Sequence, residues 1–135
     1  MANPNIAALT SIYGNTAYVI PSTTGATTSW TYNGTTALTG LTPATGTVNK
    51  ITGLLVSNTT ATAAYATVGI GNNATFGSAT LVGYLAYQIS VPAGATLIIT
   101  DKTTDFYVTE NQSVGVTSGT ASALTFTATF EAISA

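Results

Sequence analysis

The clearest pattern along the chain is an alternation of apolar and polar positions near its C-terminus. In ALTFTATFEAIS, Leu124, Phe126 and Phe130 fall on one face of an extended segment, whereas threonines fall on the other. A repeat of two residues is typical of a β-strand that has one buried face. We therefore expect residues 123–134 to form a strand at the border of the core.

Shorter segments of similar character recur along the rest of the chain, and turn residues separate them. They are rich in Thr, Val, Ile, Tyr and Phe, which suit a pleated and half-buried surface. No segment has the apolar spacing of an amphipathic helix. The further segments expected to form strands are 16–20, 28–33, 47–57, 63–70, 81–91, 95–100, 105–109 and 113–117.

These segments predict an all-β fold. They follow one another at intervals of roughly 8 to 15 residues, a spacing that is typical of β-sandwiches and barrels. Because the chain offers no helical crossover, the strands should pair mainly in antiparallel fashion. The predicted fold is an antiparallel β-sandwich of about eight strands, for which a jelly-roll order and an immunoglobulin-like order are both open.

One turn in the C-terminal half combines charge with local hydrogen-bonding capacity. Asp101-Lys102-Thr103-Thr104 separates the predicted strands 95–100 and 105–109. Asp is common in turns because its carboxylate accepts hydrogen bonds from the backbone that follows it. We expect a hairpin turn here, flanked by Asp101 and Asp105.

The length of 135 residues suits one domain. We divide the chain into an N-terminal extended arm, residues 1–12, and a single β-sandwich domain, residues 13–135. The arm carries Ile6, Leu9 and Ile12. It is either a plain overhang or an arm that reaches onto a neighbouring subunit, and these three side chains would then contact the partner.

Residues 21–46 form a Thr- and Gly-rich segment with one tryptophan. The simpler interpretation is a long surface excursion with one or two short strands. The functional interpretation is a contact loop in which Trp30 and Tyr32 act as aromatic anchors for a partner, because such side chains often dominate binding energy. Both interpretations are open.

Charged residues are rare in this chain. They make up 4% of it, against about 25% in an ordinary soluble domain. Such a surface is either wetted by hydroxyl and amide groups alone or covered in an assembly, and we favour the assembly. The charged residues are Lys50, Lys102, Asp101, Asp105, Glu110 and Glu131.

This composition excludes two classes of partner. Nucleic-acid binding needs Lys and Arg to displace counterions from phosphates, and two lysines cannot form such a surface. Anionic membrane surfaces are excluded for the same reason. The opening MANPNIAALT lacks the pattern of a secretory signal, and the longest apolar stretch is shorter than the roughly 18 residues of a spanning helix. We expect no nucleic acid, no membrane and synthesis in the cytosol.

The chain also offers little for catalysis. It contains no His and no Cys, on which acid–base and nucleophilic chemistry most often depend. Turn formation is the favoured role of the acidic cluster, although its oxygen atoms are of the kind that Ca²⁺ prefers and its spacing matches no EF-hand loop. We expect no enzymatic activity, no metal and no cofactor. The cluster consists of Asp101, Asp105, Glu110 and Asn111.

Three stretches of the sequence resemble small virion structural proteins from tailed phages of marine cyanobacteria. They are MANPNIAALTSIYGNTAYV, VPAGATLIITDKTTDFYVTENQSVGVTSG and TFEAIS. The resemblance covers roughly residues 1–20 and 89–134 and is weak over 21–46. It implies a place in the virion, and it carries no catalytic residues that could be transferred to this chain.

The resemblance and the residues together predict a non-enzymatic virion structural protein. A capsid decoration (cement) protein that packs on the major capsid protein is the first expectation. Exposed sheet edges are usually guarded by Lys, other charges or Pro, whereas these strands are nearly uncharged and Pro92 is the only proline beside one of the clear strands. A homo-oligomer is expected, with a trimer favoured. A tail, neck or fibre component that binds other virion proteins and a host-surface adhesin are the alternatives. The expected partner contacts are Ile6, Leu9, Ile12, Trp30 and Tyr32.

Overall fold

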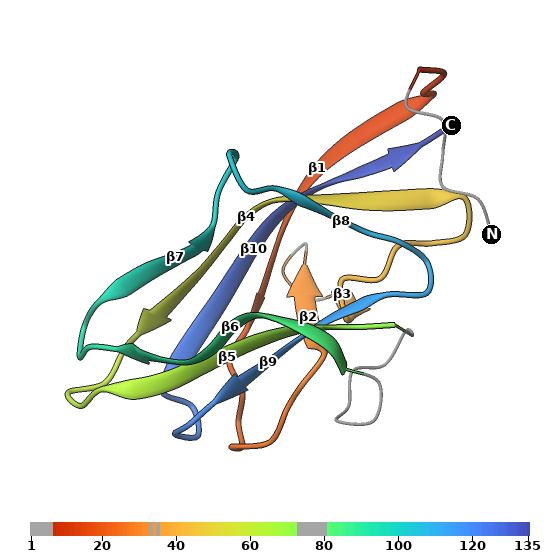
Figure 1. Cartoon of the computed structure of the whole chain (residues 1–135). Helices are drawn as coiled ribbons and strands as arrows, with labels where there is room; N and C mark the ends of the chain where they lie inside the picture. Colours follow the sequence, from red (N-terminus) through yellow and green to blue (C-terminus); the bar gives the residue numbers. More distant parts are fainter. Residues whose placement is uncertain (1–6, 33, 35, 73–80) are drawn as a thin grey trace.

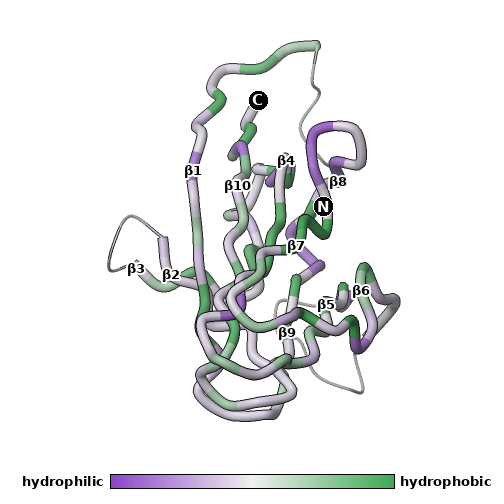
Figure 2. The backbone as a smooth tube through the Cα atoms, turned by 90° about the vertical axis from the view of Figure 1, so that its left-hand side faces the viewer, coloured by the Kyte–Doolittle hydropathy of each residue, from purple (hydrophilic) through white to green (hydrophobic). Residues whose placement is uncertain are grey.

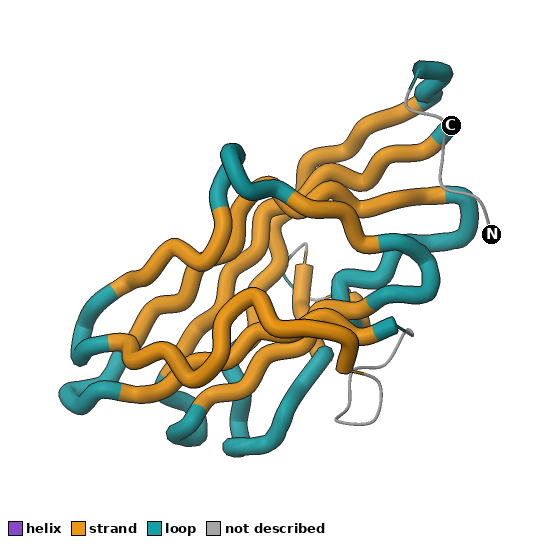
Figure 3. Tube along the Cα trace, in the orientation of Figure 1, coloured by secondary structure: helices purple, strands orange, loops and turns teal. Residues whose placement is uncertain are grey.

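The computed structural model describes residues 7–32, 34, 36–72 and 81–135. This part of the chain folds into ten strands and contains no helix (Figure 3). Accordingly, it has no helix long and apolar enough to cross a membrane. The strands are β1 (Ser11–Val19), β2 (Ser29–Tyr32), β3 (Thr36–Thr39), β4 (Thr47–Asn58), β5 (Ala64–Gly71), β6 (Leu81–Val91), β7 (Thr96–Thr100), β8 (Phe106–Val108), β9 (Ser113–Ser118) and β10 (Leu124–Ser134).

The strands form two antiparallel sheets that pack face to face (Figure 1). The larger sheet has the order β3-β2-β1-β10-β4-β7, and β8 pairs with β4 beside β7. The smaller sheet has the order β6-β5-β9. The predicted all-β antiparallel sandwich is therefore confirmed, with the β2–β3 hairpin and a separate β8 among its strands.

The order of the strands is that of a jelly roll. The last strand, β10, lies between β1 and β4 in the larger sheet, and the chain crosses between sheets at β4–β5, β6–β7, β8–β9 and β9–β10. The edge of β9 that faces away from β5 pairs with the segment before β2, where Thr27 and Val116 form an isolated bridge. Two interlocked Greek keys give this arrangement. In an immunoglobulin order the last strand would instead pair with the strand before it in the chain.

The core lies between the two sheets and draws side chains from both. Phe126 and Leu54 from the larger sheet and Val68 and Val116 from the smaller one are almost entirely buried. From Leu124 to Phe130 the alternation in β10 has the predicted sense, because the apolar positions are buried in the core while Thr127 remains half-buried on the other side. The pattern ends at Ile133, which is buried on the same side as Thr127 and lies outside the core. Burial of this apolar layer is the main source of stability in a chain without disulfides.

The turn at residues 101–105 does not close a hairpin, and that prediction is wrong. β7 and β8 both pair with β4 in antiparallel fashion, through Leu54↔Thr100 and Ile51↔Phe106. They therefore run in the same direction along one edge, and the turn is a loop in an interrupted edge strand. Local hydrogen bonds explain the turn, but the chain direction after it is set by pairing with β4.

Residues 21–46 include the β2–β3 hairpin, which extends the larger sheet beyond β1. The hairpin is followed by Gly40, whose backbone donates to Thr28 O and accepts from the Val114 N–H. Gly40 has a φ of 65°, and a Cβ added there would lie 2.5 Å from the Cβ of Ser113. Only glycine fits this close approach of the hairpin to β9.

Candidate functional site

Trp30 is part of the core and is unavailable to a partner. Its exposed fraction is 0%, and its Nε1–H donates a hydrogen bond of 3.0 Å to the backbone carbonyl of Val114 in β9. This bond ties the β2–β3 hairpin to the smaller sheet. A buried tryptophan usually needs such a partner for its N–H group. Trp30 is therefore not the surface anchor that we expected.

Tyr32, the second expected anchor, lies two residues further along β2 and is half-buried. Its ring centroid lies 6.4 Å from that of Phe130, with an angle of 59° between the ring planes. Tyr32 also lines a pocket, so part of its surface remains accessible. Of the two predicted aromatic anchors, this one can contact a ligand or partner.

Three residues of the N-terminal arm were expected to contact a partner, and one of them belongs to a strand of the larger sheet. Ile6 lies outside the described residues, and Leu9 is half-buried. Ile12 belongs to β1, which begins at Ser11, and 53% of it is exposed. It lies opposite Ile133 of β10, which is itself buried. Ile12 is thus a sheet residue at the exposed end of an apolar row and not part of a free arm.

The outer face of the larger sheet carries a row of neutral side chains that point away from the core. Tyr18 lies between the buried residues Ala17 and Val19 in β1, and it is 42% exposed. At the other end of the row, on β7, Ile98 is 70% exposed. The register places the following residues side by side on β1, β10, β4 and β7: Tyr18, Thr127, Leu55 and Ile98.

Charge on this outer face is confined to one end. Lys50 Nζ lies 3.1 Å from Asp105 Oδ2, and Glu131 lies opposite Lys50 in the register. The Asp105 carboxylate raises the pKa of the Lys50 amine, first through its hydrogen bond and then through its charge. Hydropathy colouring shows only short hydrophilic stretches along the chain (Figure 2). The part of the face around Tyr18 is neutral.

Two of the carboxylates accept hydrogen bonds from loop residues. Asp101 Oδ1 accepts hydrogen bonds from the backbone N–H and the hydroxyl of Thr103, which lower the pKa of the Asp101 carboxyl. Glu110 Oε1 accepts a hydrogen bond from the Gly46 N–H. Turn formation therefore accounts for Asp101, as predicted. The described residues include no group of three or more His, Cys, Asp or Glu side chains that could hold a metal ion.

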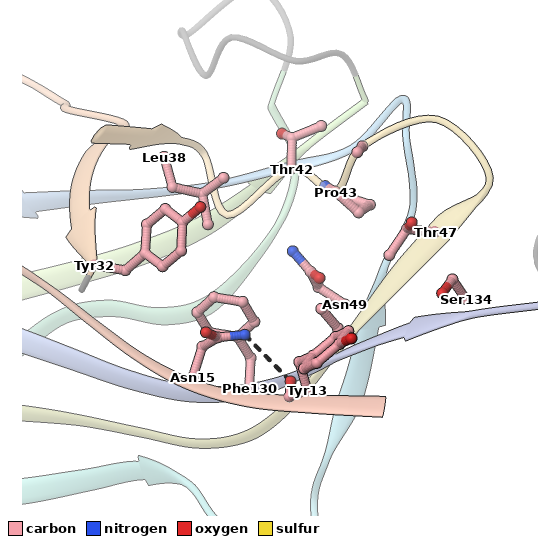
Figure 4. Close-up of a pocket in the computed structure, with 12 residues that line it drawn as sticks. Tyr13, Asn15, Tyr32, Leu38, Thr42, Pro43, Thr47, Asn49, Phe130 and Ser134 are labelled. Atoms are coloured by element: carbon pink, nitrogen blue, oxygen red, sulfur yellow. Dashed lines mark hydrogen bonds between the residues drawn. The ribbon is translucent and has the colours of Figure 1, made fainter. Parts of the chain in front are cut away.

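A pocket of about 310 Å³ opens on the inner face of the larger sheet (Figure 4). It lies between the outer ends of β1, β10 and β4 and the β2–β3 hairpin. Tyr13, Tyr32 and Phe130 give it aromatic walls, and Asn15 and Asn49 contribute amide groups. None of the described residues that line the pocket is charged.

The two amide groups of the pocket are held in place by the backbone. Asn49 is 3% exposed, and its Nδ2 group donates to Leu41 O at 2.8 Å. Asn15 Nδ2 donates to Tyr13 O at 3.2 Å, as the dashed line in Figure 4 shows. Neither amide oxygen accepts a hydrogen bond from the part of the chain that the structure describes. Both oxygens are therefore free to accept from a ligand.

Sequence reasoning missed most of this pocket. Tyr13, Asn15 and Ala17 occupy every second position of β1. The strand pattern alone would therefore place Tyr13 and Asn15 on the same face as Ala17, which is a core residue. A signal was present, because a tyrosine followed by an asparagine two residues later is unusual on a buried face.

Comparisons with protein families, with curated proteins and with solved structures found no match to this chain.

Proposed function

We propose that this chain is a non-enzymatic virion structural protein that decorates the capsid. In this role, the outer face of the larger sheet packs on the major capsid protein, and the protein acts in the virion. The observation that carries the proposal is the neutral, partly apolar row from Tyr18 to Ile98 on an outer sheet face. The resemblance of the sequence to phage virion proteins is the reason for proposing a virion as the assembly.

The near absence of charge favours burial of this face in an assembly. A free protein whose charged residues make up 4% of the chain has little electrostatic protection against self-association. A stable interface typically covers roughly 800 Å² on each partner, and aromatic side chains are enriched in its core. A face with Tyr18 on β1, Leu55 on β4 and Ile98 on β7 offers aromatic and aliphatic side chains for such an interface without the desolvation of charges.

A homo-oligomer, with a trimer favoured, belongs to the same proposal. Exposed apolar side chains also follow the edge strand β6, where Tyr84 and Tyr87 form an edge-to-face pair with centroids 4.8 Å apart. Leu85 lies between them and is 36% exposed. Contacts between copies through this edge would leave the outer face of the larger sheet available for the capsid.

The first test is the copy number of the protein in purified virions, measured by quantitative mass spectrometry against the major capsid protein. A number comparable with that of the capsid protein supports decoration of the head. A much smaller number would overturn that role and favour a tail, neck or fibre component, which is the alternative. Absence from the virion would overturn both.

The second test places a charge in the proposed contact. Ile98→Asp should abolish binding of the purified protein to capsids that lack it, because the new carboxylate would lose its hydration without gaining a partner. Tyr65→Asp is the matched control, since Tyr65 is 59% exposed on the smaller sheet. Retained binding by Ile98→Asp, or equal loss in the control, would contradict the proposed contact face.

A further inference from the structure

The pocket lies where the larger sheet extends past the smaller one. In Figure 1, β1, β10 and β4 continue beyond the ends of β5, β6 and β9. Ala17 and Val19 face the core from the inner side of β1, and Tyr13 faces the same side but is 67% exposed. The inner face of the sheet thus changes from a packed core into an open, lined pocket.

The lining selects an uncharged ligand that has both apolar and hydroxyl surfaces. Phosphate and carboxylate ligands bind most strongly to cationic side chains, and the described lining residues carry no charge. A purely apolar ligand would cover the free oxygens of Asn15 and Asn49 without giving them a hydrogen bond, which is costly. A sugar ring combines C–H faces that pack on aromatic rings with hydroxyls that donate to amide oxygens.

The size and rigidity of the pocket agree with such a ligand. Its volume of about 310 Å³ is at the lower end of the range for small-molecule sites. Tyr32 packs against Phe130, and the Nδ2 group of Asn49 is fixed by the Leu41 carbonyl. Side chains that are already held in place lose little freedom when a ligand binds.

From these observations we infer that this pocket binds an uncharged sugar unit of a polysaccharide or oligosaccharide. Tyr13 and Tyr32 provide the aromatic contacts, and Asn15 and Asn49 accept hydrogen bonds from sugar hydroxyls. The inference goes beyond the proposed capsid role and does not depend on it. The pocket and the Tyr18–Ile98 row lie on opposite faces of the larger sheet, so both can be occupied at once.

The experiment titrates the full-length chain with maltotriose, cellotriose, mannotriose and chitotriose, and follows binding by NMR chemical shifts. We expect at least one of these neutral saccharides to bind and to shift the signals of Tyr13 and Asn49. Tyr13→Ala should weaken that binding about tenfold, because it removes the exposed aromatic face. Asn15→Ala should weaken it as well.

Tyr18→Ala is the matched control, since Tyr18 lies on the same strand but on the opposite face. Its affinity for the saccharide should remain unchanged. The inference is overturned if none of the four saccharides binds, if Tyr13→Ala and Asn15→Ala bind as the unmodified protein does, or if trigalacturonate, an anionic trisaccharide, binds more tightly than the neutral ones. Copy number in the virion is measured separately, so failure here leaves the capsid proposal intact.

Discussion

Tyr13 and Tyr18 lie on the same strand, β1, but face opposite sides of the larger sheet. Tyr13 lines the pocket beside Asn15, and Tyr18 begins the neutral row that ends at Ile98. The odd separation between the two tyrosines produces this arrangement, because successive side chains of a strand alternate between faces. One strand therefore presents a different aromatic side chain to each of two surfaces.

This arrangement predicts that capsid binding responds to one tyrosine and not to the other. Tyr18→Ala should weaken binding to capsids about tenfold, because it removes a large aromatic contact from the proposed interface. Tyr13→Ala should bind capsids as the unmodified protein does. Co-sedimentation with purified capsids measures both variants, and a loss of binding by Tyr13→Ala would show that the pocket side contacts the capsid.

Trp30 provides a prediction about stability. Trp30→Phe should lower the free energy of unfolding by about 1–3 kcal/mol, because the buried carbonyl of Val114 loses its donor. Trp30→Ala should cost about 3–5 kcal/mol, since it also leaves a cavity between the hairpin and β9. Urea unfolding followed by circular dichroism measures both values. A change within about 0.5 kcal/mol for Trp30→Ala, as for an ordinary surface substitution, would contradict the buried position.

The strand content of this chain follows from local pattern, whereas its connectivity does not. The alternation of Phe126 and Phe130 with threonines was sufficient to predict β10 and its buried face. At Asp101, however, the local hydrogen bonds indicated a turn but not that β8 would continue along the edge of β4. Pairing between distant segments decides that direction, and a single sequence carries no record of it.

The same limit applies to the site. Trp30 donates to Val114, a residue 84 positions away, so its burial depends on a contact that periodicity cannot reveal. Tyr32 was predicted as a contact residue and lines the pocket with part of its surface accessible. The pocket itself arises because β1 extends beyond the end of the smaller sheet. The sequence of one segment does not reveal how long its strand is relative to the strands of the other sheet.

Gly40 gives a prediction with a matched control in the same region. Gly40→Ala should destabilise the protein by about 2 kcal/mol or more, because its φ of 65° is strained for alanine and the new Cβ meets Ser113 at 2.5 Å. Gly46 also has a positive φ, 76°, but an added Cβ there meets no atom of the described chain within 4 Å. Gly46→Ala should therefore cost only about 1 kcal/mol. Thermal or urea unfolding separates the two, and equal costs would rule out the contact with Ser113.

Ser113 predicts a substitution that increases stability. Its Oγ is buried and has no hydrogen-bond partner in the described structure. Removing an unsatisfied buried hydroxyl eliminates a desolvation penalty of about 1–3 kcal/mol, from which the loss of packing must be subtracted. Ser113→Ala should therefore raise the free energy of unfolding by about 1 kcal/mol. The control is Ser118→Ala, which removes a hydroxyl that donates to Thr120 O, and it should lower stability.

The turn at Asp101 predicts a defined dependence on pH. Hydrogen bonds from Thr103 lower the pKa of the Asp101 carboxyl below its ordinary value of 3.8. A lowered folded-state pKa means that the carboxylate form stabilises the fold, so the contribution is complete above pH 3.8 and is lost as the pH falls through the folded-state pKa. Carboxyl ¹³C chemical shifts measured between neutral and acidic pH give the pKa directly. In Thr103→Ala, which keeps the backbone N–H but lacks the hydroxyl, the pKa should rise toward the ordinary value. An unchanged pKa in that variant would show that the hydroxyl of Thr103 does not hold the carboxylate.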